Sequence, residues 1–556
     1  MKKTGTISLV LAVAMLLTLL SGCGTEGTSP SSFVEDTTTP YEVISETEET
    51  SEESQEDLFS LPVSEELVTY TLFTGVDPRV VDLVNLDDLA HEYAGYAEIT
   101  RLSNVTFDIT AIAAMAYTEQ FQLMTASNDY CDIIYGVEDN YATGANGALE
   151  DEVIIDLYDL IETYTPNLFD YIQQYSDLKA RAINDNGQIG SLPLLLAEPG
   201  QENSGYTIRQ DWLEAMNMDM PETMDALETY LYAANETYGA YVCITDEYTF
   251  PPLSTAMGFT LSGTYRENGS NELIFGWTSD KAYSYIEKIH QWYVDGLIPS
   301  DFTSVDMSSI QTGIASGTYS IASVNGASDL ITLYSYTDEP AVIFTGLGSL
   351  PMDENSTIEY ASANSIVKTV SEWSVSSQCE NPVPLMLLMN YMYTDEGRIL
   401  NSWGTEGYSY DFDENHVPQW TDLIVNNPDG YSYVVARTVY AAGNLPGILD
   451  MSRDYYNFTE SEWDAYDAFM GLNQDINNFP TAATNCMTSD ESIAAAALYM
   501  DMETYIAEMV GQWIVGNQSL TRDSFQNFRN TLEEMGLAEY LDYYQTAYDR
   551  YLTKIA

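Results

Sequence analysis

Basic residues are scarce in this chain. It has 18 lysines and arginines against 86 aspartates and glutamates, which gives a formal net charge of −68 at pH 7. A surface of this charge repels nucleic acid and anionic lipid headgroups, and it offers no basic cluster to hold polyphosphate. The composition therefore excludes nucleic acid as a partner and favours a highly soluble body.

Cysteine and histidine are also rare. The chain has five cysteines and three histidines, and no two cysteines form a CxxC pair. The cysteines are Cys23, Cys131, Cys243, Cys379 and Cys486. Such wide spacing argues against a zinc site and against a dense disulfide framework, while one distant disulfide and ordinary buried thiols both remain compatible with it. Since no metal triad or nucleophile–base pair is readable either, we expect no catalytic residues, no metal and no cofactor.

Long apolar runs are absent except at the amino terminus. There, Lys2 and Lys3 precede the charge-free run Ile7 to Leu20, which small residues separate from Cys23. The run has the length of a signal peptide rather than of a membrane-spanning helix, and its end resembles a bacterial lipobox. This pattern predicts a signal peptide over 1–22 and a lipid anchor, palmitate included, on Cys23. The mature chain would then sit on the extracellular face of the cell membrane, held by lipid alone.

The next segment, 23–65, is rich in serine, threonine, glutamate and proline. Residues 24 to 66 carry thirteen acidic residues and no basic one. A segment of this composition cannot bury enough apolar surface to offset the entropy of ordering. We expect a flexible acidic tether, with ordered structure starting near Leu67.

From Leu67 the sequence alternates between β-type runs and amphipathic helical segments. Five elements are expected in order, namely a strand at 67–73, a helix at 83–102, a strand at 105–109, a helix at 118–126 and a strand at 132–135. This alternation predicts the α/β class with a parallel sheet. Ligands bind beyond the carboxyl ends of such strands, which points to Thr74, Gly75, Tyr135 and Gly136.

A second α/β unit follows. Thr278-Ser-Asp280 opens a helix whose apolar positions Ala282, Ile286, Ile289 and Tyr293 share one face, and 492–515 reads as a long regular helix. Around Arg209, Asp211 and Trp212, a helix start with an internal ion pair and a buried tryptophan is favoured over a ligand-contacting set. Trp277 and Trp292 are expected in the core, and Asp411, Asp413 and Glu414 are interpreted as a solvated turn rather than a calcium loop.

Several short motifs, taken in order, resemble one known family. They are Phe121-Gln-Leu-Met-Thr-Ala-Ser-Asn-Asp-Tyr-Cys-Asp-Ile-Ile-Tyr135, Ile208-Arg-Gln-Asp-Trp-Leu213, Trp292-Tyr-Val-Asp-Gly-Leu-Ile-Pro-Ser-Asp-Phe302, Tyr391-Met-Tyr-Thr-Asp-Glu-Gly397, Trp403-Gly-Thr-Glu-Gly-Tyr408, Asn427-Pro-Asp-Gly430 and Gln545-Thr-Ala-Tyr-Asp-Arg-Tyr551. In order and spacing the chain resembles the extracellular solute-binding lipoproteins (family 1) of bacterial carbohydrate ABC transporters, over nearly the whole body.

The resemblance implies a two-lobed, type II periplasmic-binding-protein-like fold with parallel-sheet cores and a multi-stranded hinge. Carried over, the N-terminal lobe would hold 66–204 and 340–403, and the C-terminal lobe 205–339 and 404–556. The chain would cross the hinge near Tyr206, Val342 and Gly404. A sugar or short oligosaccharide would lie between the lobes, and an ABC permease would read the closed form. A delivery protein of this kind is expected to be a monomer.

A sugar presents apolar C–H faces and hydroxyl groups, so its site needs aromatic rings and polar groups. The candidates for ligand contact are Tyr135, Tyr206, Asn325, Trp373, Trp403, Glu406 and Tyr408. Each has a structural alternative: the rim of the core for the tyrosine at 135, the core for both tryptophans, and a turn for Asn325 and Glu406. Relatives often have aromatic residues where this chain has Ser323-Val-Asn325-Gly326, so fewer aromatic rings are expected on that side of the binding site.

Two other functions remain open from the sequence. A glycoside hydrolase on the cell surface needs only two carboxylates, and this chain has dozens. A surface adhesin that binds insoluble glycan would share the tether and the aromatic residues. Release of reducing sugar would favour the hydrolase, and co-sedimentation with insoluble glycan would favour the adhesin.

Overall fold

The computed structural model describes most of the chain beyond the expected tether. It describes residues 59–198, 205–244, 248–261, 263–267, 269–304, 307–324, 329–334, 336–337, 339, 341–361, 366–441, 445–455, 458–472 and 476–555. The expected signal peptide, Cys23 and Asn325 lie outside these residues. Within them, no helix combines the length and the apolar character that crossing a bilayer requires.

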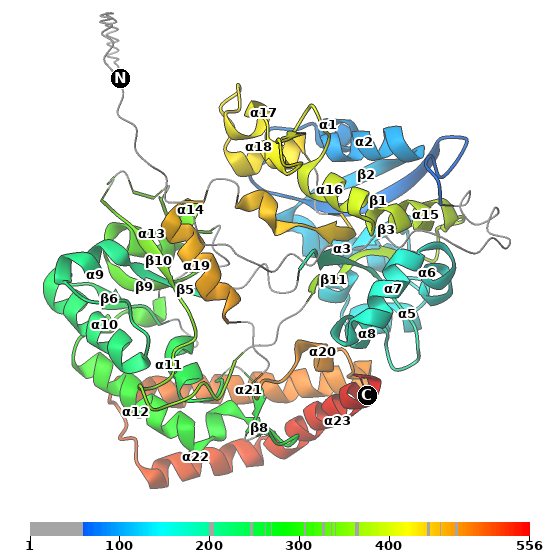
Figure 1. Cartoon of the computed structure of the whole chain (residues 1–556). Helices are drawn as coiled ribbons and strands as arrows, with labels where there is room; N and C mark the ends of the chain where they lie inside the picture. Colours follow the sequence, from blue (N-terminus) through cyan, green and yellow to red (C-terminus); the bar gives the residue numbers. More distant parts are fainter. Residues whose placement is uncertain are drawn as a thin grey trace, which may run out of the picture. The chain divides into compact units, whose positions relative to one another are not determined.

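Six strands form the larger sheet, in the order β14-β4-β11-β3-β1-β2 (Figure 1). Their bounds are β1 Val68–Val76, β2 Val105–Ala113, β3 Ile133–Tyr135, β4 Leu192–Leu196, β11 Val367–Val375 and β14 Gly447–Leu449. β1 pairs in parallel with β2 and with β3, which confirms the parallel arrangement predicted for these three strands. β11 runs antiparallel to both β3 and β4, so the sheet as a whole is mixed.

Helices cover this sheet and bury one apolar core with it. They include α1 Leu89–Glu92, α2 Ala94–Ser103, α3 Tyr117–Ser127, α6 Tyr158–Tyr164, α7 Pro166–Gln174, α8 Ser176–Ala182, α15 Val383–Met392 and α16 Asp395–Trp403. Leu72, Ile133 and Leu192 are fully buried in the core. The helix expected over 83–102 is divided because the backbone of Tyr93 is extended, with φ −90° and ψ 116°. This break turns the Tyr93 side chain toward a pocket described below.

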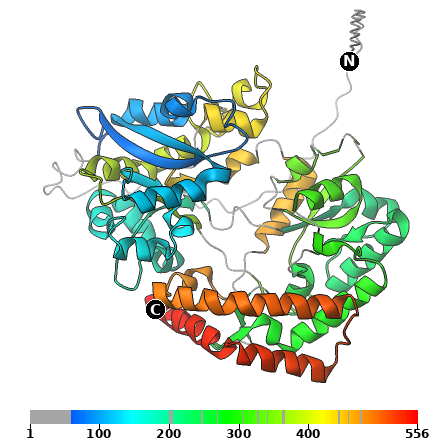
Figure 2. The same cartoon turned by 180° about the vertical axis from the view of Figure 1, so that it is seen from behind.

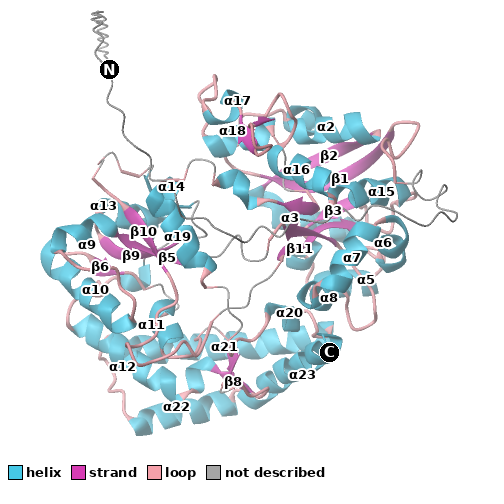
Figure 3. Cartoon of the chain, in the orientation of Figure 1, coloured by secondary structure: helices cyan, strands magenta, loops and turns pink. Residues whose placement is uncertain are grey.

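The second sheet has four strands in the order β10-β5-β9-β6, and Figure 3 shows the strands of the two sheets as separate groups. Their bounds are β5 Gly205–Arg209, β6 Tyr241–Val242, β9 Tyr319–Val324 and β10 Phe344–Leu347. Here only β6 and β9 pair in parallel, because β5 runs antiparallel to both of its neighbours. The parallel core expected for this lobe is therefore limited to one strand pair.

The helices beside this sheet confirm several local predictions. They include α9 Gln210–Met216, α10 Met224–Tyr238, α11 Pro251–Ala256, α12 Asp280–Val294 and α13 Met307–Ser316. α12 begins after Ser279, whose hydroxyl accepts a hydrogen bond from the Ala282 N–H, and Trp292 is fully buried on it. Both guanidinium–carboxylate bonds of the Arg209–Asp211 pair form, at 2.6 and 2.7 Å.

Three long helices close the chain. α21 Ser489–Ile514, α22 Arg522–Glu534 and α23 Leu537–Ile555 follow one another, and α21 and α23 lie side by side in Figures 1 and 2. α21 packs on α12, whereas α23 packs on α8 beside the first sheet. The helix predicted over 492–515 is thus present and begins one turn earlier, where Thr488 and Glu491 form a capping box.

Two segments lie in the sheet opposite to the one that we expected. β14 comes from 404–556 yet pairs with β4 of the first sheet, and β10 comes from 340–403 yet pairs with β5 of the second. The buried Asn401 amide explains the first case, because it donates to the carbonyls of Leu445 and Ile448 and so fixes β14 next to α16. The expected hinge crossings near Tyr206, Val342 and Gly404 stay predictions.

Candidate ligand-binding site

A pocket of about 510 Å³ lies where strands of the first sheet end. We call it the first-sheet pocket, and its lining includes Thr74, Gly75, Asp77, Arg79, Tyr93, Tyr96, Tyr117, Tyr135, Glu372 and Arg437. Thr74 and Gly75 stand at the carboxyl end of β1, and Tyr135 ends β3. The pocket is therefore at the place predicted from the parallel strand order.

Four polar groups of this pocket have no hydrogen-bond partner among the described residues. They are the hydroxyls of Tyr93, Tyr96 and Tyr135 and the carboxyl group of Glu372. Tyr117 differs, because its hydroxyl donates to the Tyr135 carbonyl at 2.7 Å and fixes the two rings edge to face at 5.9 Å. Hydroxyl and carboxyl groups that line a cavity can exchange hydrogen bonds with a polar molecule that enters it, so these four groups form a candidate ligand-binding set.

Glu372 is the most buried charged side chain of this pocket, with 5% of its surface exposed. It lies on β11 next to Trp373, which is 2% exposed and packs edge to face on Phe107. Burial raises the pKa of the Glu372 carboxyl to about 8, and the Lys368 ammonium opposes that shift. Glu372 is accordingly neutral at pH 7. Burial also raises the pKa of Tyr135 to about 12.

The two guanidinium groups of the pocket are already paired. Arg79 holds both carboxylate oxygens of Asp77, at 2.5 to 3.1 Å, and these hydrogen bonds lower the pKa of Asp77. Arg437 is paired with the buried carboxylate of Asp454, which also accepts a hydrogen bond from Tyr433 at 2.8 Å. Asp454 also lies 3.6 Å from the Arg453 guanidinium, so one carboxylate outside the lining serves two arginines, whereas the Asp77–Arg79 pair lies wholly in the lining.

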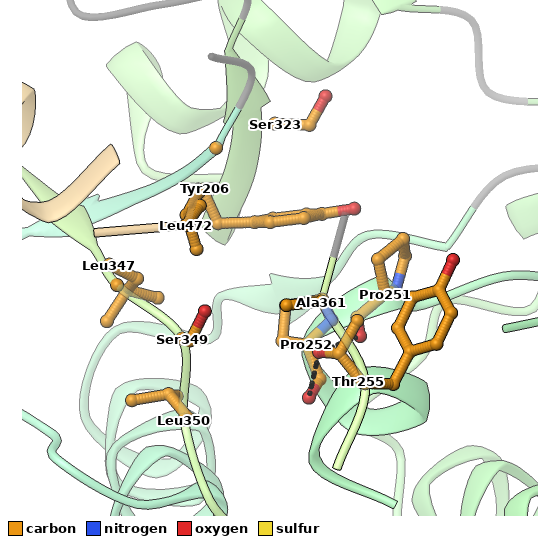
Figure 4. A pocket seen from close by; sticks show the side chains of 13 residues that line it. Tyr206, Pro251, Pro252, Thr255, Ser323, Leu347, Ser349, Leu350, Ala361 and Leu472 are labelled. Atoms are coloured by element: carbon orange, nitrogen blue, oxygen red, sulfur yellow. Dashed lines mark hydrogen bonds between the residues drawn. The ribbon is translucent and has the colours of Figure 1, made fainter. Parts of the chain in front are cut away.

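A second pocket, of about 370 Å³, lies on the second sheet. We call it the second-sheet pocket, and its lining includes Tyr206, Pro251, Pro252, Thr255, Ser323, Leu347, Ser349, Leu350, Tyr360 and Ala361. Figure 4 shows the Tyr206 ring crossing the pocket, with Leu347, Ser349 and Leu350 on one side and Pro251, Pro252 and Thr255 on the other. Tyr206 lies between Ser323 and Leu347 in the sheet. Its ring packs on Phe250 at 6.0 Å, and burial raises its pKa.

Two glycines, Gly205 and Gly346, allow a helix to pack closely against the strands of the second sheet. A Cβ atom on Gly205 would lie 2.3 Å from the ring of Phe469, and one on Gly346 would lie 2.6 Å from Ala465 Cα. Both of these partners belong to α19 Glu460–Met470, which packs on β10. The two glycines thus let α19 approach the strands that carry Tyr206 and Leu347.

The structure places the sequence candidates in different surroundings. Tyr135 and Tyr206 each line one of the two pockets. Trp373 and Trp403 are buried in apolar clusters, where the ring of Trp403 lies 4.5 Å from that of Trp420. Glu406 and Tyr408 are exposed in the turn before β12 Tyr410–Phe412, outside the lining of both pockets. For these four residues ligand contact stays a prediction.

Sequence reasoning missed Glu372, Tyr93, Tyr96, Tyr117 and Arg437. Trp373 and Glu372 belong to strand β11, and no strand was predicted there from the sequence. Had Val367–Val375 been recognised as a strand, alternation would have put Glu372 on the opposite face from the apolar Trp373. Nothing in the sequence marked the extended backbone at Tyr93, which brings it to the same pocket as Tyr96.

The acidic segment after β12 forms the turn that the sequence predicted. Asp413 Oδ1 accepts hydrogen bonds from the N–H groups of Asn415 and Val417, at 2.9 and 2.8 Å. Across the described part of the chain, no group of three or more histidine, cysteine, aspartate or glutamate side chains is arranged to hold a metal ion. Cys131, Cys243, Cys379 and Cys486 are free thiols.

No family model matches the chain. A curated relative is the fructooligosaccharide ABC transporter substrate-binding protein FusA of Streptococcus pneumoniae, which is 24% identical over 479 residues, covering 78% of this chain and 83% of FusA.

Two solved structures share the fold. FusA in complex with kestose superposes with a TM-score of 0.63 at 20% identity, over 87% of this chain and 99% of FusA. An HMO-binding, ABC-transporter-associated solute-binding protein from Bifidobacterium longum infantis superposes with a TM-score of 0.68 at 15% identity, with the same coverage. The fold is thus the type II periplasmic-binding-protein-like fold, and the expected resemblance to solute-binding proteins of ABC transporters is confirmed.

Proposed function

We propose that this chain is the substrate-binding lipoprotein of a bacterial ABC importer, and that it captures a sugar or short oligosaccharide for delivery to a membrane permease. The observation that carries the proposal is the group of polar side chains in the first-sheet pocket that are available to hydrogen-bond a ligand. Three tyrosine hydroxyls and one carboxyl group surround a single cavity without partners among the described residues. The relatives named above, which bind fructooligosaccharide, kestose and HMO, support the same class of ligand.

The chemistry of both pockets suits a saccharide. Tyrosine rings offer flat surfaces on which the C–H faces of a sugar stack, and their hydroxyls exchange hydrogen bonds with sugar hydroxyls. The first-sheet pocket supplies Tyr93, Tyr96 and Tyr135, and the second-sheet pocket supplies Tyr206 and Tyr360. We propose that one ligand contacts both pockets, since in a two-lobed fold the hinge brings one sheet against the other on closure.

The ion pairs favour a neutral saccharide over a uronate. A carboxylated sugar needs a free guanidinium or ammonium group, whereas Arg79 and Arg437 of the first-sheet pocket are engaged by Asp77 and Asp454. Displacing Asp454 would leave a buried carboxylate with a lost partner, and breaking a buried pair in this way is costly. Neutral hydroxyl groups match the open tyrosine hydroxyls at no such cost.

A hydrolase is less well supported by the same pocket. Retaining and inverting glycosidases both use two free carboxyl groups, one on each side of the scissile bond. Glu372 has the raised pKa of a general acid, but both oxygens of Asp77 are bound by Arg79 and are not free to attack a sugar or a water. We therefore propose binding without hydrolysis.

A thermal-shift panel tests the proposed function. The purified protein is heated with neutral saccharides, uronate oligosaccharides and buffer alone, and a ligand that binds only the folded state must raise the melting temperature by mass action. We expect at least one neutral saccharide to raise it and the uronates to leave it unchanged. The same samples should release no reducing sugar. The absence of any shift, or release of reducing sugar, would contradict the proposal.

The location at the cell surface is part of this proposal. We propose that lipid on Cys23 anchors a monomeric protein and that the acidic tether gives the binding lobes freedom to reach the permease. In a bacterial host that processes lipoproteins, the wild-type protein should sediment with membranes and incorporate labelled palmitate. The variant Cys23→Ser should do neither. Membrane retention of that variant without label would refute the anchor.

A further inference from the structure

Glu372 is a side chain of the first-sheet pocket that packing does not explain. It is a carboxyl group with 5% of its surface exposed, it lines a cavity of about 510 Å³, and it has no hydrogen-bond partner among the described residues. A buried unpaired acid costs folding free energy, and a core position on β11 would be filled better by an apolar residue. Its place in the lining of the cavity points to a role in binding rather than in packing.

We propose that Glu372 binds the saccharide as the neutral acid, donating a hydrogen bond to a sugar oxygen, so that ligand affinity depends on the protonation of this one carboxyl group. This inference rests on the proposed function and assigns the pH dependence of saccharide affinity to one group, Glu372. Of the two forms of the carboxyl group, only the neutral acid can donate a hydrogen bond.

The surroundings of Glu372 hold it in the neutral form at pH 7. Burial raises its pKa to about 8, and only Lys368, on the same strand, counteracts this. Burial, and to a smaller extent the neighbouring Glu372 carboxyl group, raises the pKa values of Tyr96 and Tyr135, which face it, so both hydroxyls stay neutral from pH 6 to pH 9. The hydroxyl of Tyr393, also close to it, is donated to the Pro193 carbonyl at 2.5 Å.

Other charged groups nearby are fixed in pairs. Asp77, Arg79 and Arg437 line the same pocket, and Asp454 pairs with Arg437 from behind the lining. The pKa values of both carboxyl groups are lowered and those of both guanidinium groups are raised, so all four stay charged from pH 6 to pH 9. The helices that also pack on β11 are α4 Val137–Asn140 and α8. Their ionisable residues are Glu138, Asp139, Asp177, Lys179 and Arg181. In the range from pH 6 to pH 9, Glu372 is thus the group of this pocket that titrates.

A cationic amino sugar fits the pocket less well. An ammonium group would pair with the ionised form of Glu372, but that form is the minor one at pH 7 because burial raises the pKa of the carboxyl group to about 8. The neutral acid beside three neutral hydroxyls suits an uncharged sugar hydroxyl or ring oxygen. A neutral sugar and a cationic amino sugar would respond to pH in opposite ways. Alkaline pH weakens binding of the neutral sugar through Glu372 and strengthens binding of the cationic one.

The test is a calorimetric titration with the neutral saccharide that gives the largest thermal shift, at pH 6 and at pH 9. With a pKa of about 8, roughly one tenth of Glu372 is neutral at pH 9, so we expect affinity about tenfold lower there than at pH 6. At pH 9 the wild-type protein should take up about one proton on binding, measured in two buffers that differ in ionisation enthalpy.

Two variants separate this role from a structural one. Glu372→Gln keeps a donor and the shape but cannot ionise, so its affinity should change less than twofold between pH 6 and pH 9, with no proton uptake. Glu138→Gln removes another acid with a raised pKa, outside this pocket, and should keep the wild-type response. Proton uptake is read from the wild-type protein alone, so it decides the question even if Glu372→Gln does not fold.

The outcomes of the test are distinct. Wild-type affinity that is constant or rises from pH 6 to pH 9, or the same pH response in Glu372→Gln, would overturn the role of Glu372 and leave the proposed function standing. Failure of every saccharide to bind at pH 6 would refute the proposed function, and this inference with it.

Discussion

Trp403 shows how burial separates a structural tryptophan from a ligand-stacking one. Its side chain is 4% exposed and packs among Tyr410, Trp420 and Ile424. A stacking platform must show one face of its ring to the ligand, and here protein atoms cover the ring. Its main effect is therefore expected on stability.

Substitution of Trp403 tests this role. Trp403→Ala should lower the free energy of unfolding by about 3 kcal/mol, because it leaves a cavity in the cluster. Trp403→Phe should lose less and should bind saccharide with wild-type affinity. Urea unfolding and titration measure the two effects. Trp463→Ala is the control and should cost less stability than Trp403→Ala, because Trp463 is 44% exposed although its ring contacts Tyr455, Phe458 and Tyr466. Lost affinity in a stably folded Trp403→Phe would instead support the ligand contact predicted from the sequence.

The sequence identified residues well where local patterns determine the environment. Trp277 and Trp292 are buried as expected, and Arg209, Asp211 and Trp212 form the helix start with an ion pair and a buried ring. It did not identify Glu372, because one glutamate among 86 acidic residues carries no signal until its strand is known. Burial and the lack of a partner, both properties of the fold, distinguish this residue.

At the scale of elements, ion pairs join the C-terminal helices to the first lobe. Arg550 of α23 makes two bonds to Glu491 of α21, at 2.5 and 2.7 Å, and a third contact of 3.3 Å to Asp185. Lys554 adds a contact of 2.8 Å to Asp185. Because Asp185 follows α8, these contacts hold α23 beside the first sheet.

The Glu491–Arg550 pair makes stability depend on pH. Hydrogen bonds from Arg550 lower the pKa of Glu491 to about 2, below its value in the unfolded chain. The pair therefore stabilises the fold fully above about pH 5, and this contribution is lost as the pH falls toward 2. In a double-mutant cycle with Glu491→Gln and Arg550→Ala, we expect a coupling of about 1 kcal/mol at pH 7.

Urea unfolding at pH 7 and pH 3 measures this coupling. It should shrink at pH 3, where more of the carboxylate is protonated in the unfolded chain. The exposed pair Arg522–Asp280, with 3.6 Å between its charged atoms, is a matched control that should show weaker coupling. Equal coupling in both pairs at both pH values would contradict this role of Glu491.

Helices and strands that are long and have a clear hydrophobic periodicity were the easiest to predict from the sequence. The strands at β1, β2 and β3 and the long helix α21 follow from periodicity, and all four are present within a few residues of the expected limits. The three-residue strand β14 is too short to carry a pattern, and its place beside β4 depends on the buried Asn401 amide. For this reason the sequence assigned 404–449 to the other lobe.

At the scale of the whole molecule, the protein combines a strongly negative net charge with a pocket whose arginines are engaged in ion pairs. The charge of −68 keeps the protein soluble and repels anionic polymers, while Arg79 and Arg437 of the first-sheet pocket are held by Asp77 and Asp454. The central claim is that a single neutral saccharide contacts Tyr135 of the first sheet and Tyr206 of the second. Neither pocket alone would then account for the affinity.

One calorimetric titration tests that claim most directly, with the best saccharide and the wild-type, Tyr135→Ala and Tyr206→Ala proteins. We expect one saccharide per chain, and a loss of about 1.4 kcal/mol or more, which is tenfold in affinity, from either substitution. Tyr241→Ala, on an edge strand outside both pockets, should bind like the wild type. Two independent sites per chain, or an affinity that responds to only one of the two pocket tyrosines, would contradict the account.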